Sequence, residues 1–203
     1  MATKEKVHWF SRIENMHPYQ TLVYLGMFGS GLIFLFLLIA FLGSQATFSF
    51  SGLSNIPKSF VVSTFALILS GYTVTKIVPQ FNASDSRKLK SAVVETLLLG
   101  LLFTGLQLLG WRELNAMGIT FVGLPSGSFL YVLSGIHLIH LVGAMIYAVV
   151  LVMHLRTCEN DAVKHLFLFS NPYERMKFML FSTYWKFMDI VWIVLFFTLI
   201  MVI

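Results

Sequence analysis

Apolar residues gather along this chain in five long runs that short polar segments separate. Each run is close to the roughly 20 apolar residues that an α-helix needs to cross the hydrocarbon core of a bilayer. We therefore predict an all-α, polytopic membrane protein, a bundle of five transmembrane helices that forms one domain over residues 1–203. The predicted spans cover residues 19–42, 57–78, 91–110, 128–153 and 179–203.

Prolines fall at the ends of these spans and not in their middles. Pro57 suits the first turn of a helix, where a missing backbone N–H costs little, and Pro79 is expected to follow a helix end. No span interior contains proline. Secondary transporters bind substrate at helices that Gly or Pro interrupts, so a small transporter is the least favoured class.

Basic residues predict the orientation of the chain. Only Lys58 and Arg112 lie on one side of the membrane, and Lys186 lies within the fifth span. The positive-inside rule then places the N-terminus in the cytoplasm and the C-terminus outside. Because these residues flank apolar spans, the net charge of +5 indicates topology and no nucleic-acid partner. The remaining basic residues are Lys4, Lys6, Arg12, Lys76, Arg87, Lys88, Lys90, Arg156, Lys164, Arg175 and Lys177.

Composition removes several other classes of protein. Charged residues make up 11% of the chain, against about 25% in soluble domains. A single cysteine, Cys158, excludes an internal disulfide and a Cys-rich metal cluster. The longest loop, residues 154–178, is too short for a soluble domain. Its apolar patch at residues 165–169, like residues 7–10, fits the membrane interface.

Ionisable residues within the spans are candidate functional residues, because a charge at bilayer depth is costly. Glu95 lies near the start of the third span, and Lys186 and Asp189 share a face of the fifth. All three lie towards the predicted cytoplasmic side, so they form a candidate ionic cluster. We favour a charge-compensated structural contact, with Lys186 extending to the interface, over a proton pathway.

Two histidines, His137 and His140, lie three residues apart on one face of the fourth span. Metal ligation, haem binding and hydrogen bonding to a neighbouring helix are the three possible roles. A di-metal bundle adds carboxylates from several helices, and a haem held by two histidines normally takes one from each of two facing helices. No other predicted span contains histidine, so we favour interhelical hydrogen bonds.

Small residues recur at intervals of four positions on three of the spans. Such spacing lets helix backbones approach closely, so these faces are predicted to pack against neighbouring helices. The residues are Gly26 and Ser30, Gly100 and Thr104, and His140, Ala144 and Ala148.

Two stretches near the C-terminal end are more specific. Residues 128–142 read SFLYVLSGIHLIHLV, and residues 183–192 read TYWKFMDIVW. They resemble two patterns of subunit III of the haem–copper terminal oxidases, F-x-x-x-G-x-H-G-x-H and Y/F-W-H-F-x-D-x-V-W. The resemblance extends to the span count of the short, five-helix form of that subunit. The matching residues are Tyr131, Gly135, His137, His140, Tyr184, Trp185, Phe187, Asp189, Val191 and Trp192.

The chain departs from the family pattern at a few positions. Lys186 replaces the histidine of the last-helix pattern, and Leu138 and Ile139 fill the interval between the two histidines. Ser63 stands where the family usually carries a Glu. Near the outer end of the third span, where a Glu is common, we find Gln107 and Gly110. A role that relies on those carboxylates is not expected here.

The resemblance implies an accessory subunit without its own haem or copper, which are expected in partner subunits. Such a chain packs against catalytic subunit I of a proton-pumping oxidase that reduces oxygen to water in aerobic respiration, with subunit II nearby. It stabilises subunit I and its proton uptake and binds phospholipid, in a bacterial inner membrane, with other respiratory complexes as further partners. We expect no catalytic, cofactor-binding or metal-ligating residue in this chain.

The residues independently agree with a non-redox role, because a catalytic oxidase subunit needs several in-span histidines and this chain has two on one helix. Two alternatives stay open: the subunit III of a quinol oxidase, and a membrane redox or transport protein of another class. We favour cytochrome c as the electron donor of the complex. The sequence specifies neither the haem type nor the residues that bind lipid.

Overall fold

The computed structural model describes residues 17–47, 57–122, 125–159 and 161–202, all of them in helices or short connections. Five helical spans in this part of the chain are long and apolar enough to cross a membrane, which confirms the predicted fold class. The helices are α2 (Pro18–Thr47), α3 (Lys58–Thr75), α4 (Ile77–Asn82), α5 (Ser86–Ala116), α6 (Pro125–Glu159), α7 (Ala162–Ser170) and α8 (Pro172–Val202).

The helices continue past the predicted spans into the polar segments. For example, α5 begins at Ser86 and ends at Ala116, whereas the apolar run covers residues 91–110. The hydrogen-bonded helix need not stop where its apolar residues stop, because polar side chains there reach water. Pro79 follows the end of α3 at Thr75, as predicted. It lies in the first turn of α4, where its missing N–H is tolerated.

Local chemistry explains two of the helix ends. Asp85 caps the start of α5, and its carboxylate accepts a hydrogen bond from the backbone N–H of Lys88 at 3.0 Å. Just beyond the end of α5, Gly118 has a φ of +82°, a left-handed conformation that suits glycine. These two signals mark the two ends of α5.

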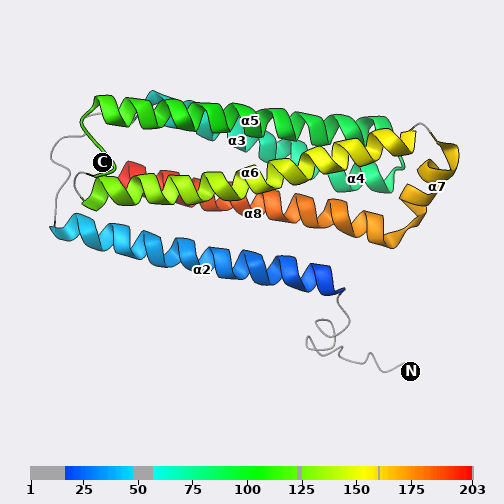
Figure 1. Cartoon of the computed structure of the whole chain (residues 1–203), viewed down its shortest axis with the longest axis horizontal. Helices are drawn as coiled ribbons and strands as arrows, with labels where there is room; N and C mark the ends of the chain where they lie inside the picture. The colour runs from blue at the N-terminus through cyan, green and yellow to red at the C-terminus, as the bar shows by residue number, and fades with distance from the viewer. Residues whose placement is uncertain (1–16, 48–56, 123–124, 160, 203) are drawn as a thin grey trace, which may run out of the picture.

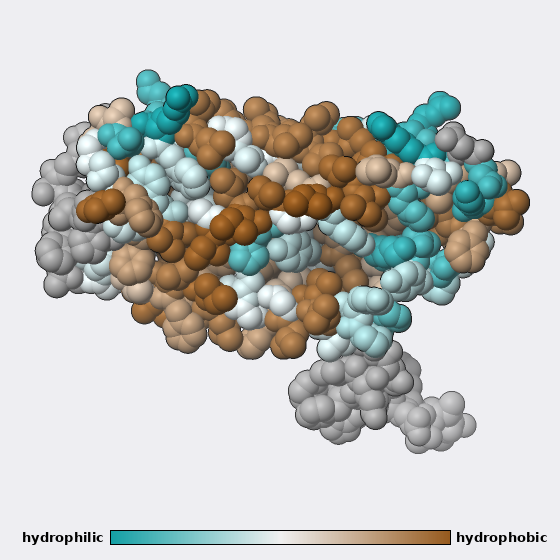
Figure 2. All heavy atoms as spheres, viewed as in Figure 1, coloured by the Kyte–Doolittle hydropathy of each residue, from teal (hydrophilic) through white to brown (hydrophobic). Residues whose placement is uncertain are grey.

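The long helices run side by side (Figure 1). Helix α3 packs most extensively on α5, and α8 contacts both α3 and α6. Helix α2 lies along one side and packs on α6 and α8. Only 17% of its most apolar window is buried, against 33–44% in the other spans, so α2 is the peripheral helix. Apolar residues cover most of the visible face, and polar residues gather towards both ends (Figure 2).

Candidate functional site

Helix α3 carries a row of small polar residues that face inward. The side-chain amide of Gln107 on α5 donates to Ser63 Oγ at 2.8 Å. The hydroxyls of Thr73 and Thr96 lie 2.7 Å apart. Each pair joins α3 to α5, and all four residues are buried. Since hydrocarbon offers no alternative partner, these bonds hold the two helices in register.

The last-helix motif continues this row towards α8. Trp185 Nε1 donates to Ser70 Oγ, and Trp192 Nε1 donates to Thr64 Oγ1, both at 3.0 Å. Both indoles are fully buried. The tryptophans of the motif therefore attach α8 to α3 through ring packing and a satisfied N–H.

Two of the positions where the chain departs from the family pattern are partners of each other. Ser63 and Gln107 each stand where a carboxylate was expected, and they form the neutral pair described above. A buried carboxylate at either position would face a group that could not neutralise it. The two neutral residues are therefore compatible with each other in the buried interface.

A carboxylate missed by the sequence analysis lies further along α5. Glu113 accepts hydrogen bonds from Ser59 Oγ at 2.5 Å and from Ser59 N–H at 3.3 Å, at the start of α3. The predicted span ended at residue 110, so Glu113 was assigned to a loop. Its spacing of six residues from Gln107 was the available signal, because the same helix continues through both.

The two histidines have different surroundings. His140 fulfils the prediction of interhelical hydrogen bonding, because its Nε2 lies 3.1 Å from Ser30 Oγ on α2. For His137 the prediction is wrong. It is fully buried, and neither ring nitrogen has a hydrogen-bond partner among the described residues. Its ring lies against those of Trp192, Phe103 and Phe34, at centroid distances of 5.1, 5.6 and 6.3 Å.

The predicted ionic cluster does not form as direct contacts. Glu95 is exposed and accepts a hydrogen bond from Ser91 at 2.7 Å. Lys186 is also exposed, and no ion pair of it is found in the described part of the chain. Asp189 is buried, and neither of its oxygens has a hydrogen-bond partner there. Its carboxylate occupies the space beside Gly71, 2.8 Å from where a Cβ would lie.

Other motif residues serve packing. Tyr131 donates to the carbonyl of Ile119 at 2.9 Å, which ties α6 to the segment after α5. Phe187 lies 3.6 Å from the Cβ position of Gly31 on α2. Tyr184 lines a cavity between α2, α6 and α8, and its hydroxyl makes no hydrogen bond to the described residues.

Of the three faces predicted from small residues, the one with Ala144 and Ala148 is buried, and Ser30 on the α2 face is buried against α6. The two glycines differ. A Cβ at Gly100 would lie 2.8 Å from the ring of Trp185, so this glycine permits a close approach. At Gly26 nothing lies within 4 Å of the Cβ position. That glycine opens on the cavity and does not allow backbones to touch.

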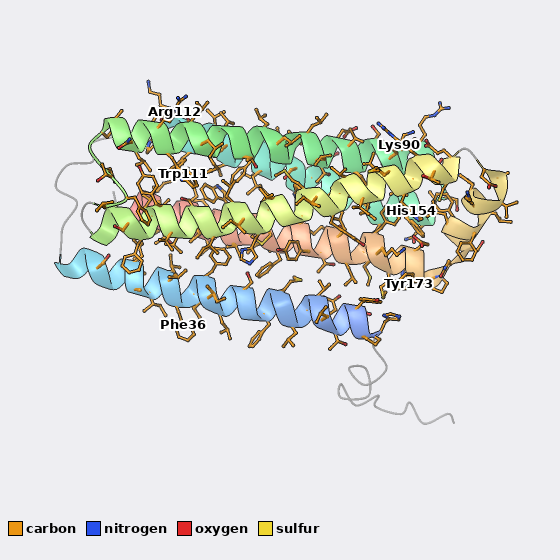
Figure 3. All side chains as sticks on the ribbon, in the orientation of Figure 1. Phe36, Lys90, Trp111, Arg112, His154 and Tyr173 are labelled. Carbon is orange, nitrogen blue, oxygen red and sulfur yellow. The ribbon has the colours of Figure 1, made fainter. Side chains whose placement is uncertain are left out.

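Charged residues gather at the end of the bundle where α8 begins. Glu174 is buried in the first turn of α8, and its carboxylate lies 3.1 Å from His154 Nε2 and 2.8 Å from Lys177 Nζ. Lys90 pairs with Glu159 at the same end, where Figure 3 shows Lys90, His154 and Tyr173. These contacts hold the start of α5, the end of α6 and the start of α8 together.

Two aspartates outside the spans cap helices at this end. The backbone N–H of Val163 lowers the pKa of Asp161, the N-cap of α7, and Lys164 adds to the effect. The backbone N–H of Lys88 likewise lowers the pKa of Asp85. Within the described residues, no group of three His, Cys, Asp or Glu side chains lies close enough together to hold a metal ion.

Comparison with known proteins gives the family. The sequence profile of "Cytochrome c oxidase subunit III" matches residues 23–202. A "Probable quinol oxidase subunit 3" of Staphylococcus aureus (strain USA300) is 26% identical over 137 residues, which cover 67% of this chain and 63% of that protein. The protein of the same name from Staphylococcus epidermidis is 25% identical over the same length. The chain thus spans less than two thirds of these relatives.

The fold and the motif residues agree with this match. Four of the five spans, the buried Trp185 and Trp192 and the histidine pair of α6 lie within the matched residues, and the match begins inside the first span. The protein is a multi-pass bacterial membrane protein, and it belongs to the cytochrome c oxidase subunit III family.

Proposed function

We propose that this chain is the non-redox subunit III of a haem–copper terminal oxidase, acting as one transmembrane domain that packs against the catalytic subunit. The observation that carries the proposal is how its polar groups are used. The hydroxyls, amides and indoles of α3, α5 and α8 bond to one another in the interior. The outward faces of these helices present apolar side chains such as Phe65, Ile68 and Leu101.

An apolar surface over an interior whose helices are joined by hydrogen bonds suits a helper that packs against protein and lipid. It stabilises the catalytic subunit and its proton uptake. The oxidase lacking this chain is expected to start at normal rates and to lose activity during sustained turnover. The measurement is oxygen consumption over many minutes by complexes purified with and without the chain. Equal durability of the two preparations contradicts the proposal.

Asp189 is the motif residue most open to a second role, and we assign it a structural one beside Gly71. Asp189→Asn keeps the shape and removes the charge. If the role is structural, the variant lowers retention of the chain in the purified complex and leaves the ratio of protons pumped per electron unchanged. A lower proton ratio with normal retention would assign the residue to proton movement.

The electron donor of the complex is a separate point. The sequence alone favoured cytochrome c, whereas the relatives are named as quinol oxidase subunits. The family as a whole is named for cytochrome c oxidase. Because the names of individual relatives are more specific than a family name, we infer quinol. The purified complex is expected to consume oxygen with a short-chain quinol and not with reduced cytochrome c. Oxidation of cytochrome c at the faster rate reverses the assignment.

A further inference from the structure

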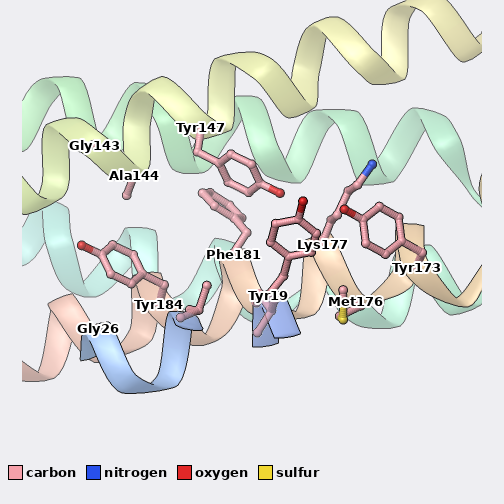
Figure 4. A pocket seen from close by; sticks show the side chains of 12 residues that line it. Tyr19, Gly26, Gly143, Ala144, Tyr147, Tyr173, Met176, Lys177, Phe181 and Tyr184 are labelled. Carbon is pink, nitrogen blue, oxygen red and sulfur yellow. The ribbon is translucent and has the colours of Figure 1, made fainter. Parts of the chain in front are cut away.

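A cavity of about 580 Å³ lies between α2, α6 and α8 (Figure 4). Its volume falls in the range of small-molecule sites, roughly 300–1,000 Å³. It lies beside α2, the least buried of the five spans. The lining residues are Tyr19, Val23, Gly26, Gly143, Ala144, Tyr147, Tyr173, Met176, Lys177, Leu180, Phe181 and Tyr184.

Unused hydrogen-bond donors line this cavity. The hydroxyls of Tyr19, Tyr147 and Tyr173 make no hydrogen bond to any residue that the structure describes. Figure 4 shows these three side chains on the same side of the cavity as Lys177. A single tyrosine hydroxyl at the membrane interface commonly bonds to water. Three tyrosine hydroxyls around one cavity, however, form a set of hydrogen-bond donors that one ligand can use. Their complement is a ligand with acceptor oxygens.

The charge of the lining argues for a neutral ligand. Lys177 is its one formal cation, and its Nζ lies 2.8 Å from Glu174 and 4.7 Å from the centre of the Tyr173 ring. The carboxylate therefore already neutralises the ammonium. A phosphate placed against Lys177 would meet that carboxylate as well, whereas a carbonyl oxygen would not be repelled in this way.

The shape of the cavity argues for a flat head group. Four tyrosines and Phe181 supply aromatic faces from all three helices. Gly26 and Gly143 face empty space, with nothing within 4 Å of either Cβ position. These glycines leave width where a larger residue would fill the cavity. A planar ring stacks on aromatic side chains, and an apolar tail would find the largely exposed apolar surface of α2 beside the cavity.

We propose that this cavity binds the ring of a membrane quinone, with its carbonyl oxygens accepting hydrogen bonds from the tyrosine hydroxyls. The choice of a quinone as the ligand rests on the quinol donor proposed above. The cavity, its hydroxyl donors and the neutralised charge of its lining are independent of that proposal. Binding alone is proposed, and no electron transfer at this position is required.

The test uses the purified oxidase complex that contains the full chain, in detergent. The probe is a photoreactive azido-benzoquinone with a decyl tail, and labelled peptides are identified by mass spectrometry. We expect label within residues 143–147 or 173–184, and competition by unlabelled decyl-benzoquinone but not by phosphatidylglycerol. Gly143→Leu fills the cavity and is expected to weaken binding at least tenfold.

Two further variants control for general damage. Gly105→Leu places the same side chain at another glycine with nothing within 4 Å, away from the cavity, and should bind the probe normally. Tyr147→Phe keeps the ring and removes one donor, so affinity should fall about three- to tenfold. Equal binding by the two leucine variants overturns the proposal, and so does displacement by phosphatidylglycerol at lower concentration than by the quinone. Retention of each variant chain in the complex reports separately on the proposed subunit function.

Discussion

Helix α8 meets the rest of the bundle on two sides, and the two sides differ in kind. Against α3 it buries two indoles whose N–H groups bond to Ser70 and Thr64. Against α2 it makes looser contacts and leaves the cavity open. Helix α8 thus has a hydrogen-bonded interface with α3 and an interface with α2 that contains a cavity. The difference shows that glycine spacing alone does not predict packing, since Gly100 meets Trp185 and Gly26 meets nothing.

The largest expected effect comes from removing an indole on the firm side. Trp185→Ala should lower the free energy of unfolding by about 3 kcal/mol, because it leaves a hole and removes the hydrogen bond to Ser70. Phe36→Ala, on the outward face of α2, should cost far less, since that ring is 65% exposed. Thermal unfolding of both variants in detergent measures the contrast. Equal losses would mean that α2 packs as firmly as α3.

A second pair of variants compares the same substitution at a tightly packed glycine between α3 and α5 and at an open glycine on α2. A Cβ at Gly110 would lie 2.2 Å from the buried ring of Phe60, whereas Gly29 has nothing within 4 Å. Gly110→Leu is expected to destabilise the protein by about 2 kcal/mol through overpacking. Gly29→Leu should be close to neutral. Denaturant titrations followed by tryptophan fluorescence would show this, and a similar midpoint for both variants contradicts it.

The neutral pair of Ser63 and Gln107 should behave as a unit. Ser63→Ala leaves the buried amide of Gln107 without its hydroxyl partner, at a cost of about 1.5 kcal/mol. Adding Gln107→Leu removes the stranded group and should restore most of the loss. A double-mutant cycle on unfolding free energies measures the coupling. Strictly additive losses would show that the pair contributes nothing jointly.

Loss of a hydrogen bond between α2 and α6 should destabilise α2 alone. Ser30→Ala removes the partner of His140 and should cost about 0.6 kcal/mol, the mean for such bonds in membranes. Hydrogen exchange should rise in α2 and stay unchanged in α3. Faster exchange in both helices would mean that α2 opens together with the whole bundle.

Lowering the pH should destabilise α7, which lies outside both interfaces of α8. The lowered pKa of Asp161 means that its cap on α7 stabilises the folded form above the ordinary value of 3.8, and that this contribution is lost as the pH falls below it. The protection factors of the Val163 and Lys164 amides, which correct for the slower intrinsic exchange in acid, should therefore fall before those in α3 or α8 change. In Asp161→Asn that acid step should disappear, and its persistence would implicate another group.

Most of the fold followed from the sequence, because apolar runs of membrane length have few alternatives to helices. The number of spans was confirmed, and Trp185 and Trp192 proved to be buried anchors. Helix ends were less predictable. Glu113 was missed because hydropathy ends before the helix does.

The contacts between helices could not be predicted in the same way. Lys186 and Asp189 share a helix face by spacing, yet the rotation of α8 leaves one exposed and buries the other. That rotation is decided by the tryptophans packing on α3, which no local pattern encodes. The aromatic rings around His137 come from three different helices, so the sequence around His137 could not predict them either.

The bonds of α3 also imply an order of assembly during synthesis. Ser59, Ser63 and Thr73 find their partners on α5, the next span to leave the ribosome. Ser70 and Thr64 instead pair with side chains 115 and 128 residues further along. A hairpin of α3 and α5 can therefore enter the bilayer with its own hydrogen bonds made. Its two remaining hydroxyls stay available until the final helix emerges and closes the bundle.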